Sequence, residues 1–357
     1  MKTRIAVIFG GTNTEHEVSL VSAQAIIKNL DQSKYDILPI KITKENTWIT
    51  PKELSASYTS VLPDKIVSAE KAIDSIDDIM EDNHIDVVFP VLHGPYGEDG
   101  TIQGMLELMR LPYVGCAVTA SAVCMDKVLQ KNICQSYGIP VAPYFWFTKN
   151  EWQTEQEDTL HKLTSQFHDQ YPLFVKPVNQ GSSVGVTKAH NQQELIDGIE
   201  LAFTRDIKVI VELGISNARE IECGLLGRGD NAESSVLGEI ISDNEFYDYN
   251  SKYINGNSHA IIPADLPEEI SNQIQDTAKL AFRVLDCYGL ARIDFLVNRE
   301  TNEYYLNELN TMPGFTPISM YPKLWEASGI SYSNLLNQLI ELAVTRSKER
   351  QSINLSK

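Results

Sequence analysis

Two short apolar runs, each leading into a glycine-containing loop, restrict most strongly how this chain can fold. Residues 5–9 run into GGTNTEHEVS, and DVVFPVLHG (86–94) leads into PYGEDG. Short apolar runs bounded by turn residues are typical of strands buried on both faces of a parallel sheet. A stretch with helical spacing of apolar residues (18–26) favours an open α/β layer, in which ligands bind at the carboxyl ends of the strands. Both loops lie at such ends, so we expect them to line a binding site.

The pattern changes near Ser121 and again near residue 215. Residues 121–138 predict one helix closed by Gly138, and the polar residues 148–170 predict another. Beyond Glu220 the pattern is that of antiparallel strands, interrupted by a long loop at roughly 243–263. At about 150 residues per domain, 357 residues predict two or three domains. We therefore predict an α/β fold that becomes α+β in its C-terminal part, with an open parallel sheet in the first of three domains: 1–121, 122–215 and 216–357.

The composition excludes several classes of protein. With 48 Asp and Glu against 30 Lys and Arg, the formal net charge is −18, which opposes general binding to nucleic acid or to an anionic membrane. The five cysteines form no CxxC pair, so we expect reduced, buried thiols rather than a zinc or disulfide framework. No apolar stretch approaches the roughly 18 residues of a membrane helix. We expect a cytoplasmic protein with no nucleic-acid or membrane partner.

The segment GLARIDFLVNRETNEYYLNELNTMPG (289–314) carries the strongest chemical signal. Apolar and polar residues alternate along it, and RETN is a plausible turn. A hairpin folded about residues 300–301 sets Asp294 opposite or next to Glu308, with Asn310 on the same face as Glu308. Three such oxygen ligands suit Mg2+ shared with phosphate oxygens. The alternative is a solvated polar strand face, but the carboxylates interrupt apolar strands and run into a Pro-Gly loop, which favours the metal.

A second signal is NQGSSVGV (179–186), between a strand and a helix. Its glycines and hydroxyls can wrap backbone NH groups around a phosphate, although it lacks the GKS or GKT of a P-loop and can also be a simple turn. Lys176 in the preceding FVKP would project toward the phosphates as a point charge. Lys127 in MDK is a second candidate, its alternative being an exposed helix lysine. GGTNTEHE is not GxGxxG, which disfavours a dehydrogenase.

Three further positions have both a functional and a structural interpretation. Glu17 follows a glycine loop and is either an acid favoured by a helix N-terminus or an anion that holds a substrate ammonium group. His93 is either a core histidine or a group of the substrate site. The tyrosine-rich loop containing Tyr249 and Tyr253 is long enough for an active-site lid, the alternative being burial against a neighbouring surface.

Together these segments resemble the D-alanine–D-alanine ligases, a family of ATP-grasp enzymes. The resemblance covers nearly the whole chain and comprises, in the family's order, GGTNTEHEVSL, FPVLHGPYGEDGTIQG, MDK, FVKP with GSSVGV, FYDYNSKY, ARIDF and NELNTMPGFTPISMYP. It implies a three-domain ATP-grasp architecture: an N-terminal substrate-binding domain, a central lid domain, and a C-terminal domain with the metal site and lid loop. It also implies an ADP-forming ligase of peptidoglycan precursor synthesis in the cytoplasm and, by analogy with the family, a homodimer.

The resemblance further implies roles for individual residues. The substrate-binding positions are Glu17 at the ammonium group of the first D-alanine with Val18 beside it, His93, and Ser319 with Met320 at the carboxylate of the second. The ATP-binding positions are Lys127, Lys176, Ser183 and the lid residue Lys252 at the phosphates, Glu212 at the adenine hinge and Glu220 at the ribose. The catalytic positions are Ser182 with Tyr253, which close the lid, and Arg292 with Gly314, which stabilise the tetrahedral intermediate. The metal ligands are Asp294, Glu308 and Asn310, holding two Mg2+ ions for which Mn2+ can substitute. VELGISNARE is one residue longer than the family's connector, which affects the adenine contacts at 213–216.

In such an enzyme ATP phosphorylates the carboxylate of the first D-alanine, and the amine of the second attacks the acyl phosphate. The substrates are then D-alanine and ATP, and water has to be excluded because it would hydrolyse the intermediate. Two alternatives stand beside this function: a ligase that accepts D-lactate or D-serine second, and a nucleotide-binding ATP-grasp protein without catalysis. Tyr253 disfavours D-lactate, since phenylalanine accompanies lactate in the family, and the retained Arg292 and metal ligands disfavour a non-catalytic protein.

Overall fold

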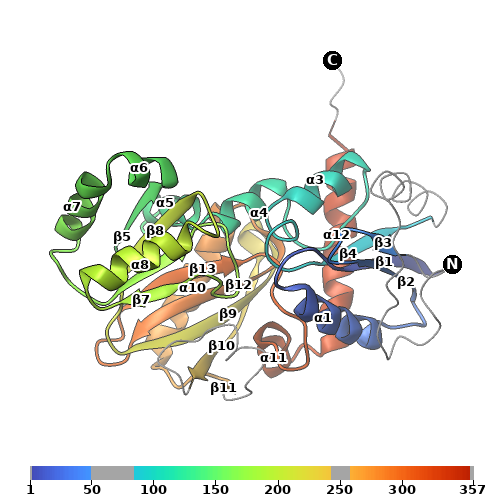
Figure 1. The fold of residues 1–357 in the computed structure, drawn as a ribbon. Helices are drawn as coiled ribbons and strands as arrows, with labels where there is room; N and C mark the ends of the chain where they lie inside the picture. The colour runs from blue at the N-terminus through green and yellow to red at the C-terminus, as the bar shows by residue number, and fades with distance from the viewer. Residues whose placement is uncertain (1, 50–83, 243–257, 354–357) are drawn as a thin grey trace.

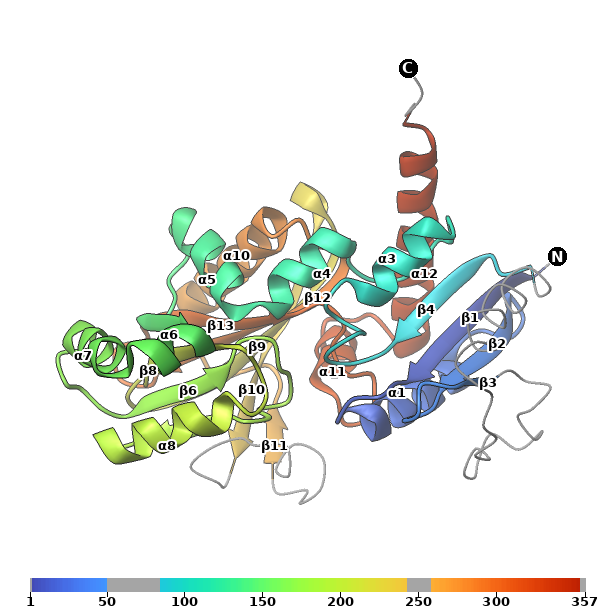
Figure 2. The same ribbon diagram turned by 45° about the horizontal axis from the view of Figure 1, so that its top comes forward.

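A computed structural model describes residues 2–49, 84–242 and 258–353 (Figure 1). The predicted lid residues Lys252 and Tyr253, with Tyr249, lie outside the described residues, as does the segment 50–83. Three sheets follow one another along the chain. Figures 1 and 2 show the N-terminal sheet at one end of the molecule and the other two sheets together at the opposite end. No helix within the described ranges is both long and apolar enough to cross a bilayer.

The N-terminal sheet has the strand order β3-β2-β1-β4. β1 (Thr3–Gly10), β2 (Tyr35–Ile42) and β4 (Val87–Val91) are parallel, and the short β3 (Trp48–Ile49) pairs antiparallel with β2. Alternate residues of β1 face opposite sides. One set packs with α1 (His16–Asn29) and α12 (Tyr332–Gln351), and the other with α3 (Thr101–Leu108). This arrangement confirms the predicted open parallel sheet and places the carboxyl ends of β1 and β4 side by side.

The second sheet has the order β5-β8-β6-β7 and is antiparallel. Its strands are β5 (Tyr144–Thr148), β6 (Leu173–Pro177), β7 (Thr187–Ala189) and β8 (Lys208–Leu213). α6 (Lys149–Thr154), α7 (Gln156–Gln166) and α8 (Gln192–Ala202) accompany it, and its apolar side chains form a core with theirs. The glycine-rich segment 179–186 joins β6 to β7, so it lies beside Lys176, near the end of β6.

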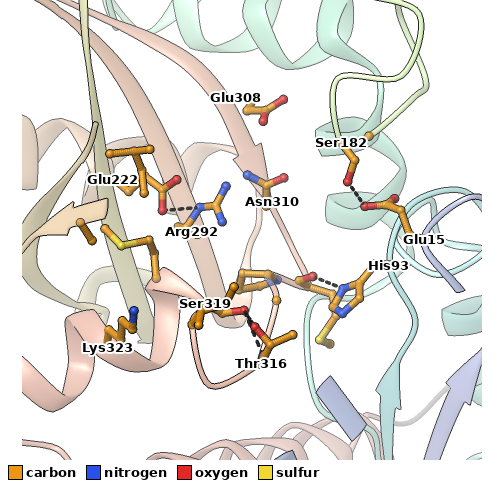
Figure 3. A pocket seen from close by; sticks show the side chains of 18 of the residues that line it. Glu15, His93, Ser182, Glu222, Arg292, Glu308, Asn310, Thr316, Ser319 and Lys323 are labelled. Atoms are coloured by element: carbon orange, nitrogen blue, oxygen red, sulfur yellow. Dashed lines mark hydrogen bonds and ion pairs between the residues drawn. The ribbon is translucent and has the colours of Figure 1, made fainter. Parts of the chain in front are cut away.

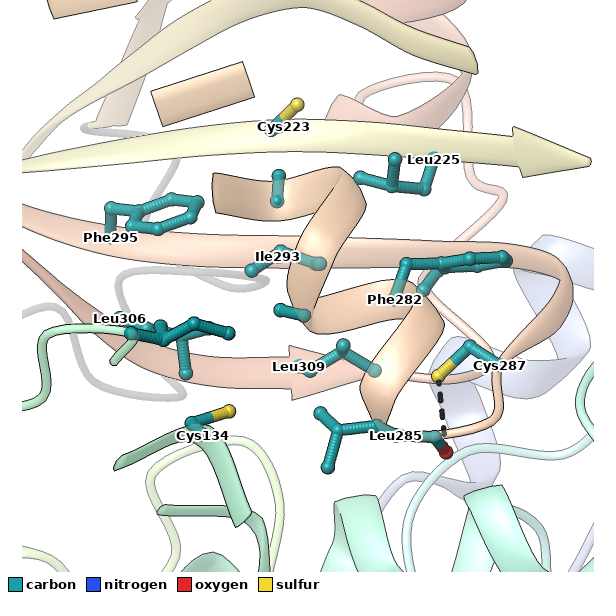
Figure 4. Packing of buried hydrophobic residues seen from close by; sticks show 14 of the residues in the cluster. Cys134, Cys223, Leu225, Phe282, Leu285, Cys287, Ile293, Phe295, Leu306 and Leu309 are labelled. Atoms are coloured by element: carbon teal, nitrogen blue, oxygen red, sulfur yellow. Dashed lines mark hydrogen bonds between the residues drawn. The ribbon is translucent and has the colours of Figure 1, made fainter. Parts of the chain in front are cut away.

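The third sheet has the order β11-β10-β9-β12-β13 and is antiparallel throughout. Its strands are β9 (Ala218–Arg228), β10 (Glu233–Ser242), β11 (Ser258–Ile261), β12 (Tyr288–Asn298) and β13 (Tyr304–Asn310), with the short 3-10 helix η1 (Gly229–Asn231) between β9 and β10. Figure 4 shows α10 (Glu268–Val284) packed through Phe282 against Ile293 and Leu309. Because side chains alternate along a strand, burial of Ile293 and Phe295 on this face leaves Arg292 and Asp294 on the other.

The segment after β13 is anchored in the core of the N-terminal sheet. Met312 and Phe315 belong to the same buried cluster as Phe89 of β4, and the Phe89 and Phe315 rings meet edge to face with centroids 5.8 Å apart. Arg346 of α12 donates to the backbone oxygens of Tyr113 and Gly115. α11 (Met320–Ala327) follows this segment and packs on β9 and β10. The polar face of the third sheet is thereby held against the loops of the first.

Three predicted boundaries differ from the structure. The helix predicted at 121–138 is two helices, α4 (Val118–Met125) and α5 (Lys127–Ser136), because Asp126 is extended and its carboxylate accepts from the backbone of Val128 and Leu129 at 3.0 Å, capping α5. The polar stretch expected as one helix at 148–170 forms α6 and α7. The end of the loop predicted at roughly 243–263 contains β11, which extends the sheet beside β10.

Candidate active site

Three adjoining cavities follow the polar face of the third sheet. The first, about 570 Å³, lies between this sheet and the loops after β1 and β4. The second, about 70 Å³, lies between it and the end of β6, and the third, about 410 Å³, continues beside β8. Glu222 and Glu308 line both the first and the second cavity, while Lys176 and Glu220 line both the second and the third. The site is thus one continuous path with its charged groups at the junctions.

Arg292 of β12 lines the first cavity (Figure 3) and contacts Glu222, which lines the first and second cavities, and Asp294, which lines the second. Its Nε is 2.8 Å from Asp294 Oδ1 and 3.0 Å from Glu222 Oε2, and a terminal guanidinium nitrogen is 2.6 Å from Asp294 Oδ2. Burial alone would lower the pKa of Arg292, but the charges of Asp294 and Glu222 raise that pKa well above its ordinary value. The site therefore holds a permanent, fixed cation.

The predicted hairpin register is confirmed. Asp294 and Glu308 are partners across β12 and β13, with a register shift immediately after Asp294, and Asn310 pairs with Arg292. The side-chain nitrogen of Asn310 donates to Asp294 Oδ2 at 3.1 Å. Within the described ranges, no three His, Cys, Asp or Glu side chains gather as a metal cluster. The oxygen-bearing side chains that the hairpin brings together are the carboxylates of Asp294 and Glu308 and the amide of Asn310. Hard oxygen donors of this kind fit a divalent cation such as Mg2+.

The two predicted phosphate-binding lysines both line the second cavity. Lys127 is buried at the start of α5, and its Nζ donates to the backbone oxygen of Gln180 at 2.6 Å. Lys176 donates to Glu212 Oε2 at 2.8 Å and to Asn307 Oδ1 at 3.3 Å. Burial opposes ionisation of Glu212, but the charges of Lys131 and Lys176 outweigh it and lower the pKa of Glu212 to about 2. Glu220 lines the second and third cavities.

The glycine-rich segment places two consecutive serines in the left-handed region, with φ of +48° at Ser182 and +59° at Ser183. Ser182 lines the first cavity and donates to the Oε1 atom of Glu15, whereas Ser183 lines the second. A Cβ atom on Gly181 would lie 2.9 Å from Glu15 Oε2, so glycine permits the close approach of this segment to the carboxylate. The segment therefore connects the two cavities and touches the loop after β1.

The structure places Glu17 outside the site and Glu15 inside it. The Glu17 side chain is 65% exposed and pairs with Lys44 at 2.8 Å, while Glu15 is 7% exposed and lines the first cavity. Asn13 donates to the backbone oxygens of His93 and Pro95 at 2.7 Å, which fixes the loop so that Glu15 at the helix N-cap faces inward. Two residues further on, the helix has turned by about 200°, and Glu17 points to solvent. This corrects the expectation for Glu17.

His93 and Glu98 line the first cavity from the loop after β4. His93 Nδ1 lies 2.9 Å from the backbone oxygen of Met312 and its Nε2 lies 3.1 Å from Ser22 Oγ; burial lowers the pKa of His93 to about 4. Glu98 accepts from the backbone nitrogens of Gly94 at 2.9 Å and Met312 at 3.1 Å. Burial and the charge of Glu15 raise the pKa of Glu98 to about 8. At neutral pH both side chains are uncharged and tie the loop to Met312.

The far wall of the first cavity is formed by the segment that leads into α11. Gly314, Ser319 and Met320, three of the predicted site residues, line the cavity. Ser319 Oγ lies 3.0 Å from the backbone nitrogen of Thr316 and 2.7 Å from Thr316 Oγ1. A Cβ atom on Gly314 would lie 2.7 Å from Ser319 Oγ, so a side chain at this position would displace the Ser319 hydroxyl. Lys323, one turn further along α11, adds a cation to the same wall.

The structure therefore brings most of the predicted positions together and adds others. Val18 is buried in α1 and is not among the residues that line the first cavity. The site residues that sequence reasoning missed are Glu15, Glu98, Lys131, Glu222, Asn307 and Lys323. Signals for some of them were present: Lys131 follows Lys127 by one helical turn, and Glu222 follows Glu220 on the same face of β9.

The three sheets and the path of cavities between them define the class of protein: an ATP-grasp fold with a carboxylate-bearing hairpin. Two family models match the chain, "D-ala D-ala ligase N-terminus" over residues 4–116 and "D-ala D-ala ligase C-terminus" over residues 133–341. The chain belongs to the D-alanine–D-alanine ligase family, and it is an ATP-dependent, ADP-forming ligase.

Individual relatives extend over the full length. The D-alanine–D-alanine ligase of Caldicellulosiruptor bescii is 46% identical, with 100% of this chain and 99% of the relative covered. The solved structure of the D-alanine–D-alanine ligase from Coxiella burnetii has a TM-score of 0.78 at 36% identity and covers 98% of this chain and 96% of its own. The VanG D-Ala:D-Ser ligase from Enterococcus faecalis has a TM-score of 0.79 at 36% identity, with 96% and 100% covered. The name of this last structure thus gives D-Ala and D-Ser in place of two D-alanines.

Proposed function

We propose that this protein joins two molecules of D-alanine at the expense of ATP, in the synthesis of a cell-wall precursor in the cytoplasm. The observation that carries the proposal is the position of Arg292, held between Glu222 and Asp294 where the first cavity meets the second. A phosphoryl group on the side of Lys127 and Lys176 and an amino-acid carboxylate on the other side would meet beside this guanidinium. Positioning and electrostatic stabilisation then supply most of the catalysis.

The first D-alanine lies in the first cavity with its ammonium group at Glu15. Glu15 is the buried acid of this wall and faces the glycine-rich segment through Ser182. Glu98 beside it is neutral at pH 7, since its pKa is raised to about 8, so one negative charge meets one ammonium. The substrate carboxylate then points toward Arg292 and the second cavity. We assign to Glu15 the role that the family pattern first indicated for Glu17.

ATP occupies the second and third cavities. Its phosphates lie at Lys127, Lys176 and the backbone of Ser183, its adenine at the hinge that contains Glu212, and its ribose at Glu220. Asp294, Glu308 and Asn310 are the donors for two Mg2+ ions, for which Mn2+ can substitute. Bound there, the cations would neutralise the charge on the transferring phosphoryl group. Lys252 and Tyr253, outside the described residues, belong to the lid in this proposal and close the site against water.

The second D-alanine enters beside the wall formed by the segment 314–320. Its carboxylate is held by Ser319 and the backbone at Met320, with the charge of Lys323 one turn away. Its amine attacks the acyl carbon, and phosphate leaves. The oxyanion that develops on that carbon is met by the guanidinium of Arg292 and the backbone NH of Gly314, fixed donors that need no reorganisation during the reaction.

A homodimer is part of the proposal. The exposed Leu108 and Val118, on the neighbouring helices α3 and α4, support it because they offer apolar side chains for a contact. Sedimentation velocity on the wild type and on Leu108→Glu tests it: we expect a dimer for the former and a weakened dimer for the latter. A monomer at every concentration would contradict it.

The reaction is tested by phosphate release from ATP and Mg2+ with four mixtures: D-alanine, L-alanine, D-alanine with D-lactate, and D-alanine with D-serine. Products are identified by mass spectrometry. We expect turnover with D-alanine alone and a product with the mass of D-alanyl-D-alanine. If the enzyme forms a mixed product with D-serine or D-lactate in preference to D-alanyl-D-alanine, the protein is instead one of the alternative ligases that accept D-serine or D-lactate as the second substrate. No turnover in any mixture would overturn the proposed reaction.

A further inference from the structure

Lys131 is a fully buried lysine at the edge of the nucleotide path. It lies on α5 four residues after Lys127, so both project from one face of the helix. Its side chain is 0% exposed, and its Nζ is 3.2 Å from Glu212 Oε1 and 3.2 Å from the backbone oxygen of Asn307. Lysine is almost never buried to this extent without a charged partner. Glu212, on β8, is that partner.

Glu212 is shared between two lysines. Its Oε1 atom faces Lys131, and its Oε2 atom accepts from Lys176 at 2.8 Å. Asn307 joins the same network, since its backbone oxygen contacts Lys131 and its side-chain oxygen accepts from Lys176 at 3.3 Å. Lys176 retains some exposure, 13% of its side chain, and lines the second cavity, whereas Lys131 lies behind it without access to that cavity.

The charges of this triad do not cancel. Lys176 paired with Glu212 alone would form a neutral pair and would attract an anion only weakly. With Lys131 behind Glu212, the three groups carry one net positive charge, and the exposed member of the triad is Lys176. We propose that Lys131 is a positioning residue for ATP: it neutralises Glu212, so that the charge of Lys176 is available to the phosphates. This inference rests on the proposed placement of the phosphates at Lys176.

A purely structural role for Lys131 makes a different prediction. If Lys131 only ties α5 to β8 and β13, its loss would lower the stability of the protein and weaken the binding of every ligand of the cleft alike. As a charge partner of Glu212, its loss affects ligands according to their charge. Adenosine and ATP share the adenine and ribose but differ in the phosphates, so the ratio of their dissociation constants separates the two roles.

The experiment measures binding of ATP with Mg2+, and of adenosine, by isothermal titration calorimetry. Lys131→Met removes the charge and keeps the length of the side chain. We expect it to weaken ATP about tenfold and to leave adenosine within about twofold of the wild type. Lys162→Met is the matched control, because Lys162 is an exposed lysine of α7 paired with Asp158; its ATP affinity should equal that of the wild type.

The double variant Lys131→Met with Glu212→Gln completes the test. It removes the buried ion pair as a unit, a change that proteins often tolerate, and it leaves the charge of Lys176 uncompensated. Because Glu212 also belongs to the proposed adenine hinge, the readout is the ratio of the ATP and adenosine dissociation constants, which we expect to return to within about threefold of the wild-type ratio. If Lys131→Met alone fails to fold, the double variant is used to test the proposal instead.

The outcomes separate this inference from the proposed function. Equal weakening of ATP and adenosine in Lys131→Met overturns the role of Lys131. So does a double variant in which the ratio of the ATP and adenosine dissociation constants stays tenfold above the wild-type ratio. A wild type that binds ATP no more tightly than adenosine overturns the placement of the phosphates itself.

Discussion

Glu15 and Glu17 offer a matched pair of acids, two residues apart, in opposite environments. Glu15 is buried in the wall of the first cavity, and Glu17 is paired with Lys44 at the surface. We predict that Glu15→Gln lowers kcat/KM for D-alanine by about 10- to 150-fold and leaves KM for ATP within about twofold. Glu17→Gln should change kcat/KM less than about twofold, because an exposed ion pair contributes roughly 0–1 kcal/mol and only to stability.

The magnitude for Glu15 follows from its burial. A carboxylate and an ammonium group about 4 Å apart interact by about 4 kcal/mol at an effective dielectric constant of 20. Part of this is lost to desolvation, so a hydrogen bond to a charged group contributes about 1.5–3 kcal/mol net. Since each 1.4 kcal/mol corresponds to about a factor of ten, the expected loss lies between about 10- and 150-fold. Gln keeps the shape and the hydrogen bond from Ser182 but not the charge.

The assay is the initial rate of phosphate release over a range of D-alanine concentrations at saturating ATP, with thermal unfolding of each variant as the check on folding. Two results would refute the reasoning. One is full kcat/KM in Glu15→Gln with an unchanged melting temperature. The other is a large loss in Glu17→Gln, which would return the ammonium site to the exposed residue.

Three further predictions concern the metal, the lid and the pH dependence. Asp294→Asn and Glu308→Gln should each abolish Mg2+-dependent turnover while the protein remains folded; wild-type rates in both would remove the metal site. Tyr253→Phe should raise the use of D-lactate relative to D-alanine, as judged by product masses, and an unchanged ratio would show that this tyrosine does not set specificity. The pKa of His93 is lowered from 6.5 to about 4 in the folded protein. Between these two pH values the histidine is protonated in the unfolded chain but neutral in the folded protein, so the free energy of unfolding falls as the pH drops from about 6.5 toward 4. Urea unfolding should then show a loss between pH 7 and 4.5 that is smaller in His93→Gln by about 2–3 kcal/mol; equal losses in both proteins would contradict the burial of a neutral His93.

The sequence predicts best those features that depend on local alternation. The parallel strands of the first sheet follow from their apolar runs, and the register of Asp294 and Glu308 follows from the alternation on both sides of RETN. The helix end at Gly138 is also decided locally, because Gly138, with φ of +75°, adopts the left-handed conformation that closes the preceding helix. In each case the deciding interactions lie within one strand, one helix or one turn.

Features decided by contacts between distant segments could not be predicted. The inward position of Glu15 depends on hydrogen bonds from Asn13 to the loop after β4, which is 80 residues away. The sequence places Lys131 on the same helix face as Lys127, but only the approach of β8 and β13 makes it a buried partner of Glu212. The break at Asp126 arises because its carboxylate caps the next helix, a choice that helical periodicity alone does not reveal.

The central claim is that ATP activates the carboxylate of the first D-alanine and that the amine of the second displaces the phosphate. It is tested most directly by supplying D-alanine with 18O in both carboxylate oxygens and examining the released phosphate by mass spectrometry. We expect one 18O atom in each phosphate, since the oxygen that attacks the γ-phosphorus leaves with it, and a dipeptide that keeps the remaining label. Dipeptide formed with unlabelled phosphate would contradict an acyl phosphate and, with it, the chemistry assigned to this site.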